Sequence, residues 1–207
     1  FDLDITNDAY MELIFDIKTG DIIRGRGNGN INMTLDTQGD FQLFGDINIV
    51  EGGYNFTIPN FINKEFSIQP GSTITWYGDP YAGILNLKAI YRQMASLADY
   101  DVQQEGAQGV HQRYPFLVIL DLQGDMLSPK IDFEIKIDET QVQPEATDQA
   151  RISLINNDEQ ELKRQVFSLL ILRKFSPRNG FSIGGGAVGS SLSEFLSNQF
   201  SYFISQV

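Results

Sequence analysis

The sequence predicts a mainly β fold, in which a long antiparallel or meandering sheet is followed by two amphipathic C-terminal helices. Three observations predict this class. Apolar and polar residues alternate with a period of two over much of residues 1–138, and glycine-containing steps separate these runs. From Asp158 onward, apolar residues instead recur at spacings of three and four. The first pattern is typical of a sheet with one dry face, and the last is typical of amphipathic helices.

The strand-like runs number about nine. Residues 31–36 alternate with the apolar residues at odd positions, residues 41–49 continue this phase, and the phase changes after Gly52-Gly53. Later runs cover residues 66–68, 74–76, 85–91, 116–122 and 131–137, and turn signals stand at Gly20-Asp21, Gly39-Asp40, Gly52-Gly53 and Pro70-Gly71. Buried parallel strands read as continuous apolar runs, so the alternation argues against an α/β fold.

Three regions follow from these patterns. We expect a sheet over residues 1–138, a polar linker over residues 139–157 and a helical segment over residues 158–207. Residues 97–113 are rich in Asp, Gln, Glu and Gly, and are expected to form a long, mobile loop. The first helix is expected from Asp158 to about residue 172, with Asn157 or Asp158 as its N-cap, and the second helix over residues 191–207.

Composition excludes several classes of function. The chain has 207 residues, with 15 Lys and Arg against 27 Asp and Glu, and a net charge of −12. Such acidity argues against binding nucleic acid or an anionic membrane surface by charge. Without cysteine there is no disulfide and no thiol catalysis, and a single histidine makes a His-rich metal site or a Ser-His-Asp triad a poor interpretation. No apolar run reaches the ~18 residues of a membrane-spanning helix.

The local motifs favour structural roles over chemical ones. Residues 184–189 match G-x-G-x-x-G, but they follow a helix, so an interhelical loop is the better interpretation. Residues 25–29 are glycine-rich and indicate a turn or a bulge. Asp132 and Glu134 lie on the polar side of an alternating run, where solvated charges are expected, and His111 lacks ligands at a known spacing. We therefore expect no catalytic residues, no metal and no cofactor.

The alternating runs leave two interpretations of the dry face open. It is either the core of an ordinary sandwich or the inside of a sheet that curls into a hydrophobic trough. A polysaccharide-binding or polysaccharide-cleaving extracytoplasmic β-solenoid is the alternative function, although the carboxylate cluster or stacked aromatics that it needs are not evident. An outer-membrane barrel ranks last, because paired aromatic girdles are missing and a helical segment is present.

Residues 66–80, FSIQPGSTITWYGDP, resemble the hallmark of the TamB C-terminal domain family. That family shows an apolar strand, a glycine turn, an I-x-W strand and then Gly-Asp-Pro. Residues 85–91 resemble the alternating strand that follows in the family, which ends in Ala and Tyr. Further similar stretches are residues 27–35, 41–45, 52–56, 165–172 and 191–199. The resemblance covers nearly the whole chain.

The resemblance implies a β-taco-like fold and a role in the bacterial envelope. TamB-like proteins are similar to the AsmA-like, bridge-type lipid transfer proteins. The resemblance implies an inner-membrane anchor N-terminal to this chain, a groove across the periplasm and a C-terminal end at the outer membrane. The implied partners are phospholipid acyl chains and an Omp85-family barrel resembling TamA, in lipid transport, outer-membrane protein assembly or both. It implies no enzymatic activity.

A trough of this kind needs large apolar side chains on successive strands, and acyl chains gain about 0.8 kcal/mol per buried methylene. An edge strand of the sheet is expected to pair with the barrel partner. The residues expected to line the groove are Ile31, Met33, Leu35, Phe41, Leu43, Ile47, Ile49, Tyr54, Phe56, Ile58, Ile74, Trp76, Leu85, Leu87, Phe116, Val118, Leu120, Leu122, Ile131, Phe133 and Ile135.

Overall fold

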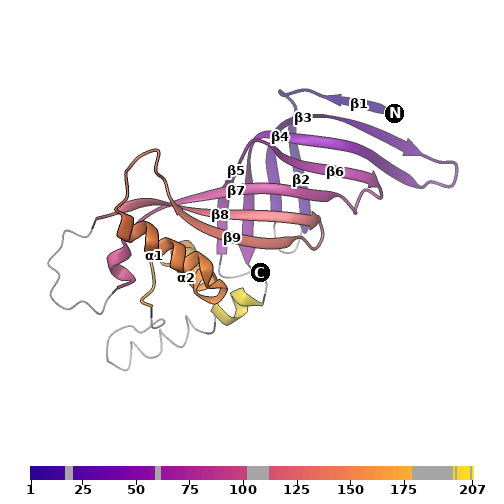
Figure 1. Ribbon diagram of the computed structural model, residues 1–207. Helices are drawn as coiled ribbons and strands as arrows, with labels where there is room; N and C mark the ends of the chain where they lie inside the picture. Colours follow the sequence, from indigo (N-terminus) through magenta and orange to yellow (C-terminus); the bar gives the residue numbers. More distant parts are fainter. Residues whose placement is uncertain (17–20, 59–61, 102–111, 179–197, 199, 206) are drawn as a thin grey trace. The chain divides into compact units, whose positions relative to one another are not determined.

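The computed structural model describes residues 1–16, 21–58, 62–101, 112–178, 198, 200–205 and 207 (Figure 1). Within these residues the chain forms one antiparallel sheet of nine strands, which confirms the mainly β class. The strands are β1 (Asp2–Ile5), β2 (Tyr10–Asp16), β3 (Asp21–Leu35), β4 (Phe41–Ile58), β5 (Ile62–Ile68), β6 (Ser72–Gly78), β7 (Ile84–Ala95), β8 (Tyr114–Asp125) and β9 (Lys130–Ile137). Their order is β1-β3-β4-β5-β7-β8-β9, with β2 on β3, and β6 on β4 and β7.

One helix lies where the sequence predicts a helix, and another lies where the sequence predicts none. Helix α2 (Glu159–Ile171) confirms the first expected helix, and the Asp158 side chain caps it by accepting a hydrogen bond from the Glu161 N–H at 3.1 Å. Helix α1 (Ala146–Asn157) lies where a polar linker was expected. Its buried apolar residues are only Ile152 and Ile155, so its apolar face is too narrow to give a clear helical period.

Two expected features fall partly outside the described residues. The expected loop 97–113 begins with a short 3-10 helix, Leu97–Asp99, and both Leu97 and Tyr100 are buried. Residues 102–111, which include His111, lie outside the description. Of the expected second helix, residues 198 and 200–204 are helical (Figure 1). Residues 184–189 and 191–197 also lie outside the described part of the chain.

Strand β4 continues through the Gly52-Gly53 step, where the sequence predicted a turn. The consecutive residues Arg26 and Gly27 of β3 pair with Glu51 and Ile49 of β4, so one residue of β4 is left over as a bulge. Because one extra residue exchanges the two faces of a strand, the bulge moves the apolar positions from odd to even numbers. The phase change that indicated a turn therefore marks a bulge inside one long strand.

Strands β3 and β4 each pair with two strands in succession. The first part of β3 pairs with β2 and its last part with β1, while the first part of β4 pairs with β6 and its last part with β5. Figure 1 shows the bend that both strands make between these two groups. At the bend, a Cβ on Gly25, Gly27 or Gly52 would lie 2.4 Å from a backbone oxygen of the neighbouring strand. Glycine is required here because the two backbones approach so closely.

The chain forms two compact units. The first contains Phe1–Tyr91 and Ile119–Asp132, and the second contains Arg92–Val118 and Phe133–Val207. Each has its own buried residues, such as Ile23, Phe66 and Ile74 in the first and Phe116, Val166 and Phe175 in the second. The division into 1–138, 139–157 and 158–207 stays a prediction. None of the helices in the described residues has the length and apolar character to span a membrane.

Candidate functional site

The inward side chains of the first unit form rows across neighbouring strands. Gly29 pairs with Ile47, Ile47 with Ile74, and Ile74 with Leu85, so four strands contribute to one row. Directly opposed residues of antiparallel strands point to the same face. Toward the β3–β4 turn, further rows contain Met33 with Leu43, and Leu35 with Phe41. The expected groove residues of these strands therefore share one face.

This face is closed over most of its area and open at one end. Ile49 and Ile74 are each 1% exposed, whereas Leu35 is 71% exposed and Phe41 is 45% exposed. Beside these two exposed residues lies a hollow of about 510 Å³, which Phe1, Met33 and Thr34 also line. The dry face is thus a packed core at the bend and an accessible apolar surface near the β3–β4 turn.

The remaining expected groove residues follow the same division. Buried in the first unit are Ile31, Tyr54, Phe56, Trp76, Leu85, Leu87, Leu120 and Leu122, while Met33, Leu43, Ile47 and Ile131 are half-buried. In the second unit Phe116, Val118 and Ile135 are buried and Phe133 is half-buried. The side chain of Ile58 lies outside the description. Contact between lipid and these residues stays a prediction.

Aromatic packing closes the face near the bend. The rings of Phe56 and Phe66 meet edge-on at a centroid distance of 6.0 Å, and Phe66 lies 5.7 Å from Tyr91. Tyr54 lies 6.4 Å from Phe56. Such contacts add to the burial of large apolar area, so this part of the face is expected to resist opening.

Phe1 is a residue of the open end that the sequence interpretation missed. Its backbone nitrogen donates a hydrogen bond to the Met33 carbonyl oxygen at 2.8 Å, and the Met33 N–H donates to the Phe1 oxygen at 2.7 Å. Phe1 is 79% exposed and lines the hollow. A single aromatic residue at the start of the chain belongs to no alternating run, so periodicity could not find it.

A row of polar contacts holds strand β1 beside β3. Asn32 donates to Asp2 at 2.7 Å, Asn30 donates to Asp4 at 2.5 Å, and Asn28 donates to Asn7 at 2.5 Å. These side chains alternate with the apolar positions of β3, so they lie on the opposite side of the strand. The polar face of β3 thereby fixes the edge strand that brings Phe1 to the hollow.

The turn next to the hollow is held by Asp36. Its carboxylate accepts hydrogen bonds from the N–H of Asp40 at 2.9 Å and of Gln38 at 2.8 Å. The Asp40 contact is the main cause that holds the pKa of Asp36 below its usual value. A carboxylate that accepts backbone hydrogen bonds closes a turn in the same manner as an Asx-turn.

Comparison with known proteins decides the family of this chain. The model of the TamB C-terminal domain matches residues 1–207, which is the whole chain. The chain belongs to this family. A search of curated proteins finds no match. The TamB family is a non-enzymatic transport and assembly family of the cell envelope, known in the context of the translocation and assembly module.

Two acidic residues of this TamB C-terminal domain that the sequence singles out, Asp132 and Glu134, lie in surface ion pairs. Asp132 is paired with Lys130 at 2.7 Å and Glu134 with Lys136 at 3.0 Å. Both carboxylates remain partly exposed, in agreement with the interpretation of a solvated polar face. Among the residues that the structure describes, no group of three or more His, Asp and Glu lies close enough to hold a metal ion.

Proposed function

We propose that the open end of the dry face holds phospholipid acyl chains, within a TamB-like protein that conducts phospholipid between the inner and outer membranes. The observation that carries this proposal is the exposure of Leu35 and Phe41 beside an apolar hollow of about 510 Å³. Water contacts these side chains in the isolated chain, and burial under an acyl chain would release it. The membership of the TamB C-terminal domain family supports the same role.

The contact needs no specific polar group. Each methylene of an acyl chain gains about 0.8 kcal/mol when it is buried against an apolar surface. The polar contacts of strand β3 lie on its other face, so they do not compete with the acyl chain for the hollow. A ligand held in this manner can also slide, because no single hydrogen bond fixes its position. We therefore assign the hollow to passage of lipid and not to tight storage.

The proposal includes a partner at the outer membrane. We infer that an Omp85-family barrel resembling TamA pairs with an edge strand, in lipid transport, in assembly of outer-membrane proteins or in both. Strand β9 ends the described strand order, and its Ile135 N–H and C=O are both hydrogen-bonded to the Asn156 carboxamide, at 3.0 and 2.8 Å. A side-chain amide makes here the two hydrogen bonds that a neighbouring strand would make, so strand addition by the partner would displace the Asn156 carboxamide.

The proposed location is the periplasm. An N-terminal segment outside this chain would anchor the protein in the inner membrane, and the C-terminal end would lie at the outer membrane. Membership of an envelope family supports this location.

Mass spectrometry of organic extracts tests the acyl-binding role. The purified chain is compared with a Leu35→Asp, Phe41→Asp variant, in which two exposed apolar contacts become charged. The control is Leu127→Asp, because Leu127 is also 58% exposed but lies in the turn between β8 and β9, away from the hollow. Since the changed residues are exposed in each variant, all three proteins are expected to fold, which circular dichroism checks.

We expect phospholipid to co-purify with the unchanged chain and with the Leu127→Asp control. The amount should fall about tenfold in the double variant, because the loss of one buried apolar side chain already costs about 1.5–3 kcal/mol. A photo-crosslinking amino acid at position 41 should capture lipid acyl chains directly. Equal lipid in all three folded proteins, or lipid in none of them, would contradict the proposal.

A further inference from the structure

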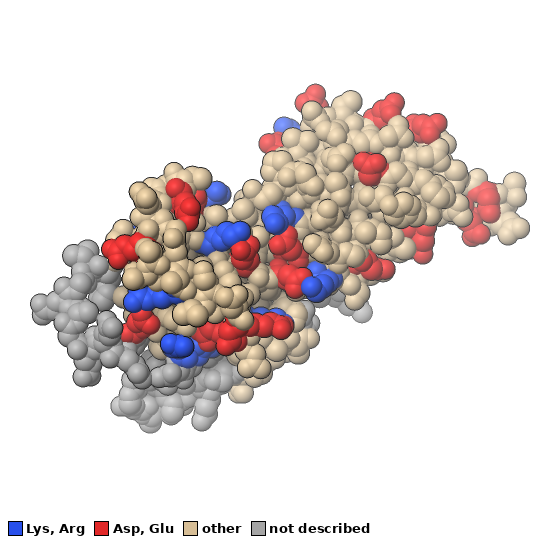
Figure 2. Space-filling view, in the orientation of Figure 1, with Lys and Arg blue, Asp and Glu red and all other residues tan. Residues whose placement is uncertain are grey.

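Three basic residues of the second unit line one hollow. Arg113, Arg173 and Lys174 surround a space of about 320 Å³, together with Asp99 and Ser96. None of the three has an ion pair with a described residue, whereas nine other Lys and Arg residues do. Figure 2 shows that basic side chains on the visible face mostly lie next to acidic ones. In a chain with 27 Asp and Glu, three cations around one hollow without an ion pair to a described residue are an exception.

The backbone that carries two of these cations is fixed. Arg173 has a φ of 58°, the left-handed conformation in which a helix commonly ends. The Lys174 carbonyl oxygen accepts a hydrogen bond from the Ser168 hydroxyl at 2.7 Å. The next residue, Phe175, is completely buried and packs edge-on against Phe116 at a ring distance of 4.7 Å. The backbone that carries both cations is therefore held in place before any ligand arrives.

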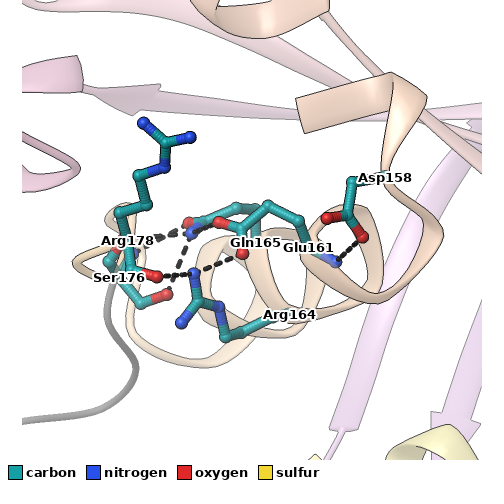
Figure 3. A network of polar contacts seen from close by, with 6 residues as sticks. All are labelled: Asp158, Glu161, Arg164, Gln165, Ser176 and Arg178. Atoms are coloured by element: carbon teal, nitrogen blue, oxygen red, sulfur yellow. Dashed lines mark hydrogen bonds and ion pairs between the residues drawn. The ribbon is translucent and has the colours of Figure 1, made fainter. Parts of the chain in front are cut away.

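A buried network of hydrogen bonds holds Ser176, the residue after Phe175. Gln165 is completely buried; its side-chain oxygen accepts from the Ser176 N–H at 2.9 Å, and its amide donates to the Ser176 carbonyl oxygen at 3.0 Å. Figure 3 shows this network, in which Arg164 also contacts Glu161 and donates to the Arg178 carbonyl oxygen at 2.8 Å. The buried hydrogen bonds between Gln165 and Ser176 hold the segment after helix α2 in place.

The third cation comes from a different part of the chain. Arg113 precedes strand β8, and its Nη2 donates to the Met94 carbonyl oxygen at 2.8 Å. Basic residues at the end of a helix are favoured by its dipole, which accounts for Arg173 and Lys174. The dipole of α2 does not account for Arg113. Among the described residues that line the hollow, one carboxylate, Asp99, stands against three cations, so their summed charge is positive.

We propose that this hollow binds a phosphate group, either that of a phospholipid headgroup or free inorganic phosphate. Arginine recognises phosphate through paired N–H donors in a planar fork, and lysine adds a charge without fixed geometry. The net charge of −12 opposes attraction of the whole chain to an anionic membrane surface. A single phosphate group in a local positive hollow avoids that repulsion. The headgroup source rests on the proposed function, whereas the phosphate site itself does not.

Nuclear magnetic resonance of the arginine side-chain Nε–H groups tests this site in the full chain. The probes are inorganic phosphate, a short-chain phosphatidylglycerol that stays monomeric, and a diacylglycerol with the same acyl chains and no phosphate. The variant is Arg173→Gln, Lys174→Gln, which keeps chain length and removes two charges. The matched control is Lys130→Gln, Lys136→Gln, which removes two charges from strand β9, outside the hollow.

We expect Arg113 and Arg173 signals to shift with both phosphate-containing probes and not with the diacylglycerol. Affinity for these two probes should fall about tenfold in the Arg173→Gln, Lys174→Gln variant and stay unchanged in the control. Tighter binding of phosphatidylglycerol than of phosphate identifies a headgroup site, and equal binding identifies a free phosphate site. Absence of shifts with both probes, or equal affinity in the folded variant, overturns the proposal. Acyl-chain capture at position 41 is measured separately, so the two proposals can fail independently.

Discussion

At the scale of single residues, the glycines of strands β3 and β4 decide how closely the folded sheet can pack. A Cβ on Gly29 would lie 2.0 Å from the Asp46 oxygen, and a Cβ on Gly45 would lie 2.0 Å from the Asn30 oxygen. Both contacts are with backbone, which cannot rotate away as a side chain would. Gly45 also has a φ of 123°, where residues with a side chain are strained.

Gly45→Ala should therefore destabilise the chain more than an alanine at another glycine with positive φ. Gly39 is the matched control, because it has a φ of 94° and no atom within 4 Å of its Cβ position. Strain alone costs about 1–3 kcal/mol, and the clash at Gly45 adds to it. Urea unfolding measures both variants. Equal free energies of unfolding would show that the sheet opens at little cost.

The carboxylate of Asp138 should make stability depend on pH. Asp138 is buried and accepts a hydrogen bond from the Thr140 hydroxyl at 2.5 Å, and Arg92 lies 3.4 Å away. The Thr140 hydroxyl is the main cause that lowers the pKa of Asp138 below 3.8. The stabilisation is complete above the unfolded pKa and is lost as the pH falls through the lower folded pKa.

Thermal unfolding at a series of pH values checks this expectation. Below pH 3.8, the melting temperature of the unchanged chain should fall more steeply than that of Asp138→Asn, because the amide of the variant does not ionise. At neutral pH the variant should melt at a lower temperature, because the Arg92 charge loses its partner. Parallel curves for the two proteins would show that Asp138 does not contribute to the acid sensitivity.

At the scale of elements, the sequence predicted those parts in which one local pattern dominates. Leu162, Val166 and Leu169 recur at spacings of four and three, and all three are buried in helix α2. Helix α1 was missed because polar residues fill most of its positions. The Gly52-Gly53 step was taken as a turn because a bulge and a turn change the apolar phase alike. Only the register of β3 against β4 separates these two cases.

The sequence predicts the shared face of the candidate site but not which part of that face is exposed. Alternation placed Leu35 and Phe41 on one face with Ile49 and Ile74, and the pairing of the strands bears out that they share a face. Periodicity carries no information about which part of that face another strand covers. Exposure at one end depends on contacts between residues far apart in sequence, so alternation alone could not separate the expected trough from a closed sandwich.

The contact between helix α1 and strand β9 gives a prediction about the edge of the sheet. Asn156→Ala would leave the N–H and C=O of Ile135 without the two hydrogen bonds that the carboxamide makes. An unsatisfied buried polar group costs about 1–3 kcal/mol, so the free energy of unfolding should fall by this order. The freed edge should also raise self-association, which sedimentation velocity at several concentrations measures.

Asn156→Asp serves as the intermediate variant in that experiment. Its carboxylate keeps an acceptor for the Ile135 N–H but loses the donor to the Ile135 oxygen. We expect its self-association to lie between that of the unchanged chain and that of Asn156→Ala. If Asn156→Ala stays monomeric and as stable as the unchanged chain, the carboxamide does not protect the edge.

At the scale of the whole molecule, the two proposed contacts differ in their physical basis. The hollow beside Leu35 and Phe41 is lined mainly by apolar side chains, whereas the hollow beside Arg173 and Lys174 is lined by charges. The net charge of −12 works against any anionic ligand at long range. Apolar burial must therefore supply the attraction at the hollow beside Leu35 and Phe41, and local positive charge must supply it at the hollow beside Arg173 and Lys174.

Raising the salt concentration should affect these two kinds of binding differently. Binding of acyl chains depends on apolar burial, so raising the salt concentration should leave it unchanged or strengthen it. Binding of phosphate near exposed cations is screened at high salt and should weaken. Titrations of the unchanged chain with the diacylglycerol, which carries no phosphate, and with inorganic phosphate, each at low and high sodium chloride, measure the two trends. Phosphate affinity that is independent of salt would contradict an electrostatic hollow.

The long pairing of β3 with β4 also bears on the order in which the chain folds. These strands are joined by the short turn at Asp36 and Asp40, so the pairs nearest the turn, such as Leu35 with Phe41, close only small loops. Contacts between residues close in sequence cost little entropy and form quickly, within about 1–10 μs for a simple hairpin. We therefore expect this hairpin to form early, with its glycine-lined bend already in place. Strands β5 and β6 would then pair with a hairpin whose bend has already formed. The curvature of the groove would therefore be set before its remaining strands are in place.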